Sequence, residues 1–156
     1  RLLVMVNYCK PDIMVRTVNF DAVTGLLDLA DLQEKISEQA AAVYFENPAY
    51  LGFLETQGEQ IAQITHAVGA ELIVVVNPIS LGIITSPVSY GMDMVCGDIQ
   101  PLGMHMNYGG GQGGFIAAPD DPKYVAEFPS RLCGITGTSQ KGEYAFGDVA
   151  FERLSF

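Results

Sequence analysis

The chain has 156 residues, of which 49% are hydrophobic and 17% charged, and its formal net charge is −10. A chain of this length and apolar content can bury one substantial core. The 18 acidic residues against 8 basic ones argue against nucleic-acid binding, which needs clustered Lys and Arg. No apolar run approaches the roughly 20 residues that span a membrane, so a membrane partner is not expected either.

The cysteines and histidines do not follow a metal-binding pattern. Cys9, Cys96 and Cys133 are far apart, and no CxxC or HxxxH spacing occurs. His66 and His105 are the only histidines, which excludes a site built from three of them. We therefore expect no metal site, and reduced thiols of the kind usual in cytoplasmic proteins.

Short apolar segments bounded by turn residues predict the strands of a sheet. In chain order they are residues 2–6, 13–20, 41–46, 72–76, 92–96 and 114–118. Segment 72–76 is uninterrupted in its apolar character and is expected near the middle of the sheet, whereas the alternating segment 13–20 is expected at an edge. Segment 114–118 follows a loop rather than a helix, so we expect it to run antiparallel to its neighbour.

Amphipathic helices separate some of these strands. Asp28 is expected to cap the first helix. The apolar residues of that helix recur at helical spacing: Leu29, Leu32 and Ile36. The second helix is predicted over residues 55–68 and ends at Gly69.

The C-terminal part of the chain predicts a short helix and a hairpin. The helix covers residues 121–128, with Pro122 at its first helical position. Segments 132–138 and 143–151 flank residues 139–142, a pattern typical of a β-hairpin with a four-residue loop.

The alternation of strands and helices predicts an α/β fold. We expect three layers: a mostly parallel sheet of about six strands, all but one of them parallel, with helices on both faces. Residues 1–130 would form this α/β portion, and residues 131–156 would begin a following segment with the hairpin. Arg1 leads directly into an apolar segment without an initiator Met, so we expect a piece of a longer polypeptide.

The loops after the strands are the expected functional edge, because parallel sheets bind ligands beyond the carboxyl ends of their strands. Asn47, Asn77 and residues 97–113 lie in these loops. The last of them is rich in glycine, which permits positive φ and close backbone approach. A crossover that only needs tight bends accounts for these glycines equally well.

Several motifs keep a fixed order along nearly the whole chain. They are Glu46-Asn47-Pro48, residues 75–82 (VVNPISLG), 90–95 (YGMDMV), 97–103 (GDIQPLG), Tyr108-Gly109-Gly110, and 129–132 (PSRL). With this set the chain resembles the P-protein of the glycine cleavage system, and specifically its non-catalytic half or first subunit. P-protein is a pyridoxal-phosphate enzyme of fold type I, so the resemblance implies the large domain of that fold.

The resemblance also implies a function. It implies an oligomeric complex that uses pyridoxal phosphate to decarboxylate glycine and passes the aminomethyl group to the lipoyl arm of H-protein. The catalytic subunit, P-protein subunit 2, would bind the cofactor through its lysine. This chain would be a non-catalytic scaffold with no catalytic or cofactor-binding residue of its own.

The residues agree with a non-catalytic role. The family places an acid at the end of the strand equivalent to 72–76, and this chain has Asn77 there. An amide cannot hold a pyridine nitrogen protonated. The family places its lysine in the crossover after the next strand, and none occurs from Asp93 to Pro122. Asn77 has a simpler interpretation as a side-chain cap of an Asn-Pro turn.

We expect a set of residues beyond the strand ends to line a site shared with the partner. They are Asn77, Gln100, His105, Tyr108, Gly109, Gly110, Gly111 and Gln112. Two alternatives remain open: another fold type I lyase, which would need its own lysine, or a free-standing nucleotide-binding α/β domain. His105 with Asp98 could also form an acid–base pair, although a structural contact explains them as well.

Overall fold

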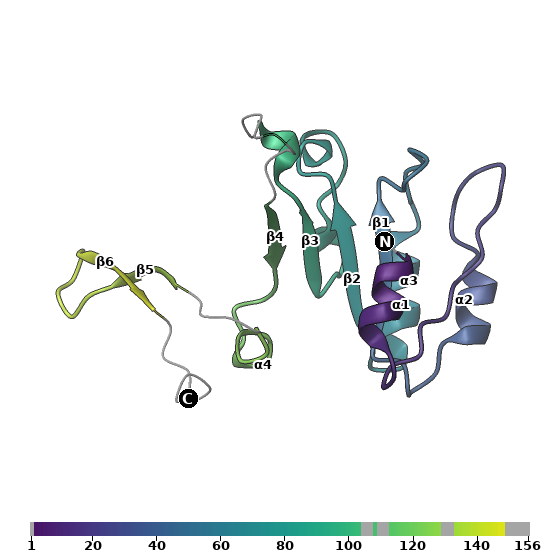
Figure 1. Cartoon of the computed structure of the whole chain (residues 1–156), viewed down its shortest axis with the longest axis horizontal. Helices are drawn as coiled ribbons and strands as arrows, with labels where there is room; N and C mark the ends of the chain where they lie inside the picture. The colour runs from purple at the N-terminus through teal and green to yellow at the C-terminus, as the bar shows by residue number, and fades with distance from the viewer. Residues whose placement is uncertain (1, 104–107, 109–112, 129–132, 149–156) are drawn as a thin grey trace. The chain divides into compact units, whose positions relative to one another are not determined.

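The structure is a computed structural model that describes residues 2–103, 108, 113–128 and 133–148 (Figure 1). Its contacts divide the chain into two units, Arg1–Ala117 and Ala118–Phe156. Unit 1 contains helices α1 (Leu2–Cys9), α2 (Leu29–Lys35) and α3 (Gly58–Ala67), and strands β1 (Ala42–Asn47), β2 (Glu71–Val76), β3 (Met94–Asp98) and β4 (Gly114–Ala117). It also contains the 3-10 turns η1 (Ser80–Gly82), η2 (Pro87–Tyr90) and η3 (Gln100–Leu102).

The sheet of unit 1 has the strand order β1-β2-β3-β4. β1, β2 and β3 are parallel, and β4 is antiparallel to β3. The central place of β2 and the antiparallel direction of β4 are therefore confirmed. The expected number of strands is wrong for the described residues, where the sheet has four strands, three of them parallel.

One face of the sheet carries the core. Alternate residues of β2 are buried, and in register with them lie Phe45 of β1 and Val95 of β3. α3 packs on β2 and α2 packs on α3, so a helical layer covers this face. Leu32 of α2 and Ile61 of α3 are buried in the same cluster. A second helical layer on the opposite face stays a prediction.

Residues 2–9 form a helix, so the expected strand over residues 2–6 is wrong. An apolar run without a clear period fits a buried strand and a helix equally well. Leucine and methionine favour the helix, and three of the first four residues of α1 are of these types. Within the described residues no side chain of α1 is buried, although most of the helix is apolar.

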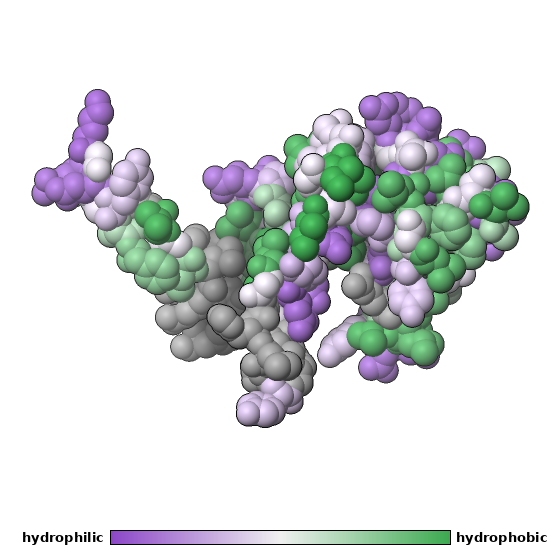
Figure 2. Space-filling view, turned by 90° about the horizontal axis from the view of Figure 1, so that it is seen from above, coloured by the Kyte–Doolittle hydropathy of each residue, from purple (hydrophilic) through white to green (hydrophobic). Residues whose placement is uncertain are grey.

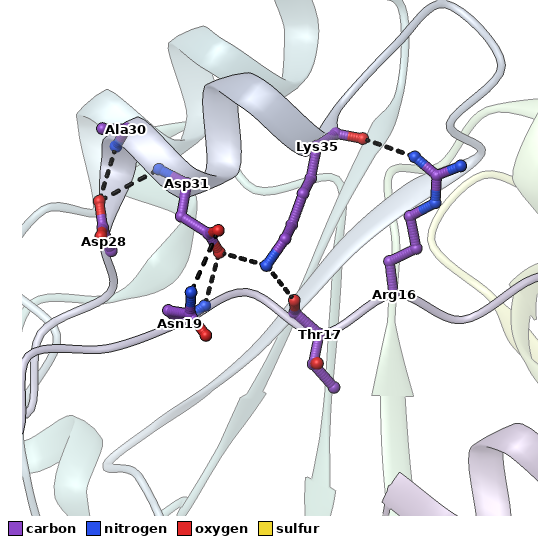
Figure 3. Close-up of polar contacts among 7 residues, drawn as sticks. All are labelled: Arg16, Thr17, Asn19, Asp28, Ala30, Asp31 and Lys35. Carbon is purple, nitrogen blue, oxygen red and sulfur yellow. Dashed lines mark hydrogen bonds and ion pairs between the residues drawn. The ribbon is translucent and has the colours of Figure 1, made fainter.

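The expected strand over residues 13–20 is also wrong, because this segment binds to α2 instead of to the sheet (Figure 3). Asn19 donates its backbone N–H and its side-chain amide to Asp31, at 2.7 and 3.2 Å. Lys35 Nζ donates to the Thr17 carbonyl at 2.9 Å and pairs with Asp31 at 2.7 Å. Side chains of α2 thus bind backbone N–H and carbonyl groups of segment 13–20 that, in a strand, would bind a neighbouring strand.

The predicted caps of α2 and α3 are confirmed. The Asp28 carboxylate accepts hydrogen bonds from the N–H groups of Ala30 and Asp31. After α3, Gly69 has φ of +77°, a left-handed conformation that glycine adopts without strain.

Unit 2 contains α4 (Pro122–Val125) and the antiparallel strands β5 (Cys133–Gly137) and β6 (Tyr144–Asp148). The Asp121 side chain accepts a hydrogen bond from the Lys123 N–H at the start of α4. α4 ends at Val125 and is therefore shorter than expected, although hydrogen-bonded turns continue to Phe128. The hairpin and its four-residue loop are confirmed, since Thr138 N–H donates to the Glu143 carbonyl at 3.0 Å. A domain boundary near residue 130 stays a prediction.

In the part of the chain that the structure describes, no helix has the length and apolar character needed to cross a membrane.

Candidate functional site

The carboxyl ends of β1, β2 and β3 lie side by side at one end of the sheet. Asn47 at the end of β1 pairs with Val76 at the end of β2, which pairs in turn with Gly97 of β3. The loops that follow the three strands therefore leave the sheet at the same end (Figure 1). We call this end the carboxyl edge.

Asn47 fixes the loop after β1. Its side-chain amide donates to the Glu55 carbonyl at 3.1 Å, and its side-chain oxygen accepts from the Glu55 N–H at 3.2 Å. The residue is 6% exposed, so these two bonds satisfy a buried amide. The chain between the two residues forms a closed loop whose ends are held together.

The Glu55 carboxylate extends this support to the neighbouring segment. One oxygen accepts from the Leu27 N–H at 2.8 Å, and the other accepts from the Gln57 N–H at 2.8 Å. The Gln57 side chain donates back to the Leu27 carbonyl at 3.0 Å. The start of α3 is therefore tied to the loop before α2, and sequence reasoning missed this network because its members are distant in the chain.

Tyr90 packs against the start of α3. A Cβ on Gly58 would lie 2.8 Å from the Tyr90 ring, so only glycine allows this approach. Burial raises the pKa of the Tyr90 phenol; Asn47 opposes this rise in part, and the Glu55 charge adds to it. Among the described residues, no atom meets the geometry of a hydrogen bond to the buried hydroxyl oxygen.

Asn77 closes its own turn. Its side-chain oxygen accepts from the Ile79 N–H at 3.0 Å. Its carbonyl accepts from the Ser80 N–H at 3.0 Å and the Ser80 hydroxyl at 2.6 Å. These bonds support the interpretation of Asn77 as the cap of an Asn-Pro turn, and they occupy the side-chain oxygen that faces the loop.

Gln100 lies at the same carboxyl edge, where its N–H donates to the Asp98 carboxylate at 2.8 Å and opens η3. Tyr108 is fully exposed and has φ of 38°, a left-handed value uncommon for tyrosine. The other five candidates, His105 and residues 109–112, lie outside the described residues. Asn77 and Gln100 are therefore the two candidates that the structure brings to one edge.

Neither of the two lysines of unit 1 belongs to the described loops of the carboxyl edge. Lys35 lies at the end of α2, bound to Asp31 and to the Thr17 carbonyl. Lys10 follows α1, and Lys123 and Lys141 belong to unit 2. Asn77 supplies no carboxylate at this edge, and the absence of a cofactor-binding residue on this chain stays a prediction.

A second polar contact, which the sequence did not reveal, lies at the amino end of β2. His66 Nε2 lies 2.8 Å from Asp93 Oδ2, and the same oxygen accepts from the Leu72 N–H at 2.7 Å. The Asp93 N–H donates to the Leu72 carbonyl at 3.0 Å. This arrangement joins the end of α3 to the starts of β2 and β3, and it is distant from the carboxyl edge.

No group of three or more His, Cys, Asp or Glu side chains within the described ranges is placed to bind a metal ion.

Residues 8–150 match the family described as glycine cleavage system P-protein. A relative described as probable glycine dehydrogenase (decarboxylating) subunit 1, from Staphylothermus marinus, is 39% identical over 141 residues, which cover 90% of this chain and 30% of the relative. The protein of the same description from Pyrococcus abyssi is 38% identical over 147 residues, covering 94% and 32%. The chain thus spans about a third of the length of these relatives.

Solved structures agree with this family. A crystal structure of glycine decarboxylase (P-protein) of the glycine cleavage system, in inhibitor-bound form, matches with a TM-score of 0.64 and 36% identity, over 74% of this chain and 25% of that one. Cystathionine gamma-lyase from Lactobacillus plantarum matches with a TM-score of 0.52 and 24% identity, over 64% of this chain and 25% of that one, and shows likeness of fold alone.

Proposed function

The chain belongs to the glycine cleavage system P-protein family, and from this membership we propose that it is part of subunit 1 of a decarboxylating glycine dehydrogenase. The whole assembly would decarboxylate glycine and transfer the aminomethyl group to lipoyl H-protein. Pyridoxal phosphate would supply the electron sink for this reaction. The family match leaves another fold type I lyase or a free-standing nucleotide-binding domain as the less favoured functions.

Within that assembly this chain acts as a non-catalytic scaffold. The observation that carries the proposal is the state of Asn77: a neutral amide stands where the family needs an acid, and its oxygen is bound to the Ile79 N–H. No lysine lies in the loops of the carboxyl edge. The cofactor would therefore be bound by the partner, P-protein subunit 2, and the assembly would be an oligomer in the cytoplasm.

The carboxyl edge would form one wall of the site shared with subunit 2. Asn77 and Gln100 support this proposal by their place beyond the ends of β2 and β3. Tyr108, His105 and residues 109–112 follow in the same crossover between β3 and β4. Their role would be to line the site and exclude water, since none of them supplies a carboxylate or a cofactor amine.

Reconstitution tests this function. The full subunit 1 polypeptide and subunit 2 are purified separately, and release of CO2 from carboxyl-labelled glycine is measured with lipoyl H-protein and pyridoxal phosphate. We expect activity from the two subunits together and none from subunit 1 alone. Turnover by subunit 1 alone would contradict the non-catalytic role, and failure of the mixture with a verified subunit 2 would contradict the family function.

A further inference from the structure

A shallow hollow of about 380 Å³ lies between α3 and the η2 segment. Its lining comes from one face of the helix and from the turn before β3: Glu59, Ala62, Gln63, His66, Ser89, Tyr90 and Gly91. At a helix rise of about 1.5 Å per residue, the lining extends roughly 10 Å along α3. The surface drawn in Figure 2 mixes hydrophilic and hydrophobic residues, and the lining of the hollow has the same mixed composition.

Two small residues and an aromatic ring form the apolar part of the lining. Gly91 has φ of +90°, and a Cβ built on it would lie 3.5 Å from the Ala62 Cβ and 3.9 Å from the His66 ring. Glycine here permits the left-handed backbone and leaves this space open. The Tyr90 ring adds an aromatic surface beside Gly58, at the start of α3. An aliphatic stem can lie along such a surface.

Asp93 determines which nitrogen of the His66 ring carries the proton. One Asp93 oxygen accepts from the Leu72 N–H at 2.7 Å and lies 2.8 Å from His66 Nε2. Because a carboxylate oxygen only accepts, Nε2 carries the proton, and Nδ1 of the neutral ring is left as a hydrogen-bond acceptor. The His66 side chain is 43% exposed, which leaves the ring within reach of a ligand.

The other polar side chains of the hollow can also accept hydrogen bonds. Ser89 Oγ donates its hydrogen to the Ser86 carbonyl at 2.6 Å, so its lone pairs remain available. The Glu59 carboxylate only accepts, and the Gln63 amide accepts through its oxygen. Among the described residues, no group pairs with the side chain of Glu59 or Gln63. Four side chains from two elements thus present acceptors to one hollow, and one of them is charged.

We propose that this hollow binds a guanidinium group on an aliphatic stem. A guanidinium has five N–H donors and no acceptor, and it forms paired hydrogen bonds with a carboxylate. Glu59 binds the group at the start of α3, where the Tyr90 ring supplies an aromatic surface for stacking. The stem lies along Ala62 and Gly91 toward the His66 ring. The net charge of −10 attracts a cation to this chain.

The guanidinium group can come from two sources, a free guanidino compound or the arginine side chain of a polypeptide. Both present the same donors to Glu59. A free compound that also carries an amine places a further donor at Nδ1 of His66, which an arginine side chain within a peptide backbone does not. Neither source takes part in the glycine reaction, so the inference goes beyond the proposed function and does not depend on it.

Saturation-transfer NMR on the full polypeptide that contains this chain tests the site with two probes. Agmatine represents the free compound, and N-acetyl-arginine methylamide represents the arginine side chain. We expect saturable binding with a dissociation constant of about 1 mM, because one exposed ion pair and one aromatic contact contribute modestly. Agmatine binding at least about threefold tighter than the arginine derivative assigns the site to a free compound, and any lower ratio assigns it to an arginine side chain.

Two substitutions on the exposed face of α3 test the assigned contacts. Glu59→Gln removes the carboxylate and should weaken binding by about fivefold or more, whereas Glu34→Gln removes the same charge from an exposed position of α2 and should leave it within about twofold. Gln63→Lys places an ammonium in the hollow and should cause a similar loss. Its control is Gln60→Lys, the same change on the same helix outside the lining. The circular dichroism spectrum of each variant checks its folding.

Two results would overturn the proposal. The absence of saturable binding by either probe up to about 20 mM would show that the hollow is too open to hold a guanidinium, or that the rest of the polypeptide covers it. Equal binding by the wild type, Glu59→Gln and Gln63→Lys would show that the probes bind elsewhere. Neither result bears on the glycine reaction, which the reconstitution with subunit 2 tests separately.

Discussion

Asn47 binds the backbone of Glu55 at both its polar groups, with the amide donating to the carbonyl at 3.1 Å and the side-chain oxygen accepting from the N–H at 3.2 Å. The pair closes the loop that carries Tyr50 and Leu51. It also fixes the Glu55 carboxylate where it meets the Leu27 N–H. One buried amide thus connects the end of β1, the start of α3 and the loop before α2.

Replacing Asn47 should weaken the fold measurably. Asn47→Ala leaves the Glu55 N–H and carbonyl without these partners in a site that is 6% exposed, which costs about 2–4 kcal/mol of unfolding free energy. Urea denaturation of the full subunit measures the loss. Gln33→Ala on the exposed face of α2 is the control and should change stability by less than about 0.5 kcal/mol. An unchanged midpoint for Asn47→Ala would show that water replaces the amide without loss.

The contact between Gly58 and Tyr90 predicts a steric effect. Gly58→Ala brings a methyl group to 2.8 Å from the Tyr90 ring, which must shift, so we expect destabilisation of about 1–3 kcal/mol despite the better helix propensity of alanine. Gly82→Ala is the control, because a Cβ there meets nothing within 4 Å. The double variant Gly58→Ala with Tyr90→Leu should recover part of the loss, and a double variant no better than the sum of its parts would contradict the clash.

Alkaline pH should destabilise the fold through Tyr90. Burial raises the pKa of its phenol above the ordinary value of 10.0, so the folded state holds this proton more tightly than the unfolded chain. Its contribution to stability is therefore fully present below pH 10 and is lost as the pH rises through the folded pKa. Unfolding midpoints of wild type and Tyr90→Phe, compared from pH 8 to 11, should diverge only at the upper end.

Acidic pH should act through Asp31. The hydrogen bond from Lys35 and the Asn19 N–H lower the pKa of this carboxyl from 3.8, so the folded state favours the carboxylate. The contribution to stability is present above pH 3.8 and is lost as the pH falls through the lower, folded pKa. Asp31→Asn should flatten the acid limb of the stability profile, with Glu34→Gln on the same helix as the control. Parallel acid limbs for wild type and Asp31→Asn would refute this role.

The elements that sequence reasoning predicted correctly are those whose signal is local. The apolar run of β2, the Asp28 cap and the four-residue loop at residues 139–142 each follow from a few adjacent residues. Segment 2–6 was predicted wrongly because an apolar run without a clear period fits a strand and a helix equally well, and segment 13–20 because its conformation depends on distant partners. The second of them follows the side chains of Asp31 and Lys35, which no periodicity in 13–20 reveals.

The sequence predicts where the candidate site lies, but it predicts only some of the contacts that the side chains make there. Strand order and the rule of carboxyl ends led to Asn77 and Gln100, which the structure brings to one edge. The contacts of Asn47 with Glu55 and of His66 with Asp93 were missed, because each joins residues through a tertiary arrangement. Side chains that bind residues distant in the chain, as those of Glu55 and His66 do, have no signature in sequence spacing.

The central claim is that this chain belongs to a subunit that holds no cofactor of its own, and one measurement tests it most directly. The complex of full subunit 1 with subunit 2 is loaded with pyridoxal phosphate, reduced with borohydride, digested and mapped by mass spectrometry. The account predicts one stoichiometric adduct on a lysine of subunit 2, and none on Lys10, Lys35, Lys123 or Lys141. A stoichiometric adduct on any of these four lysines would contradict it.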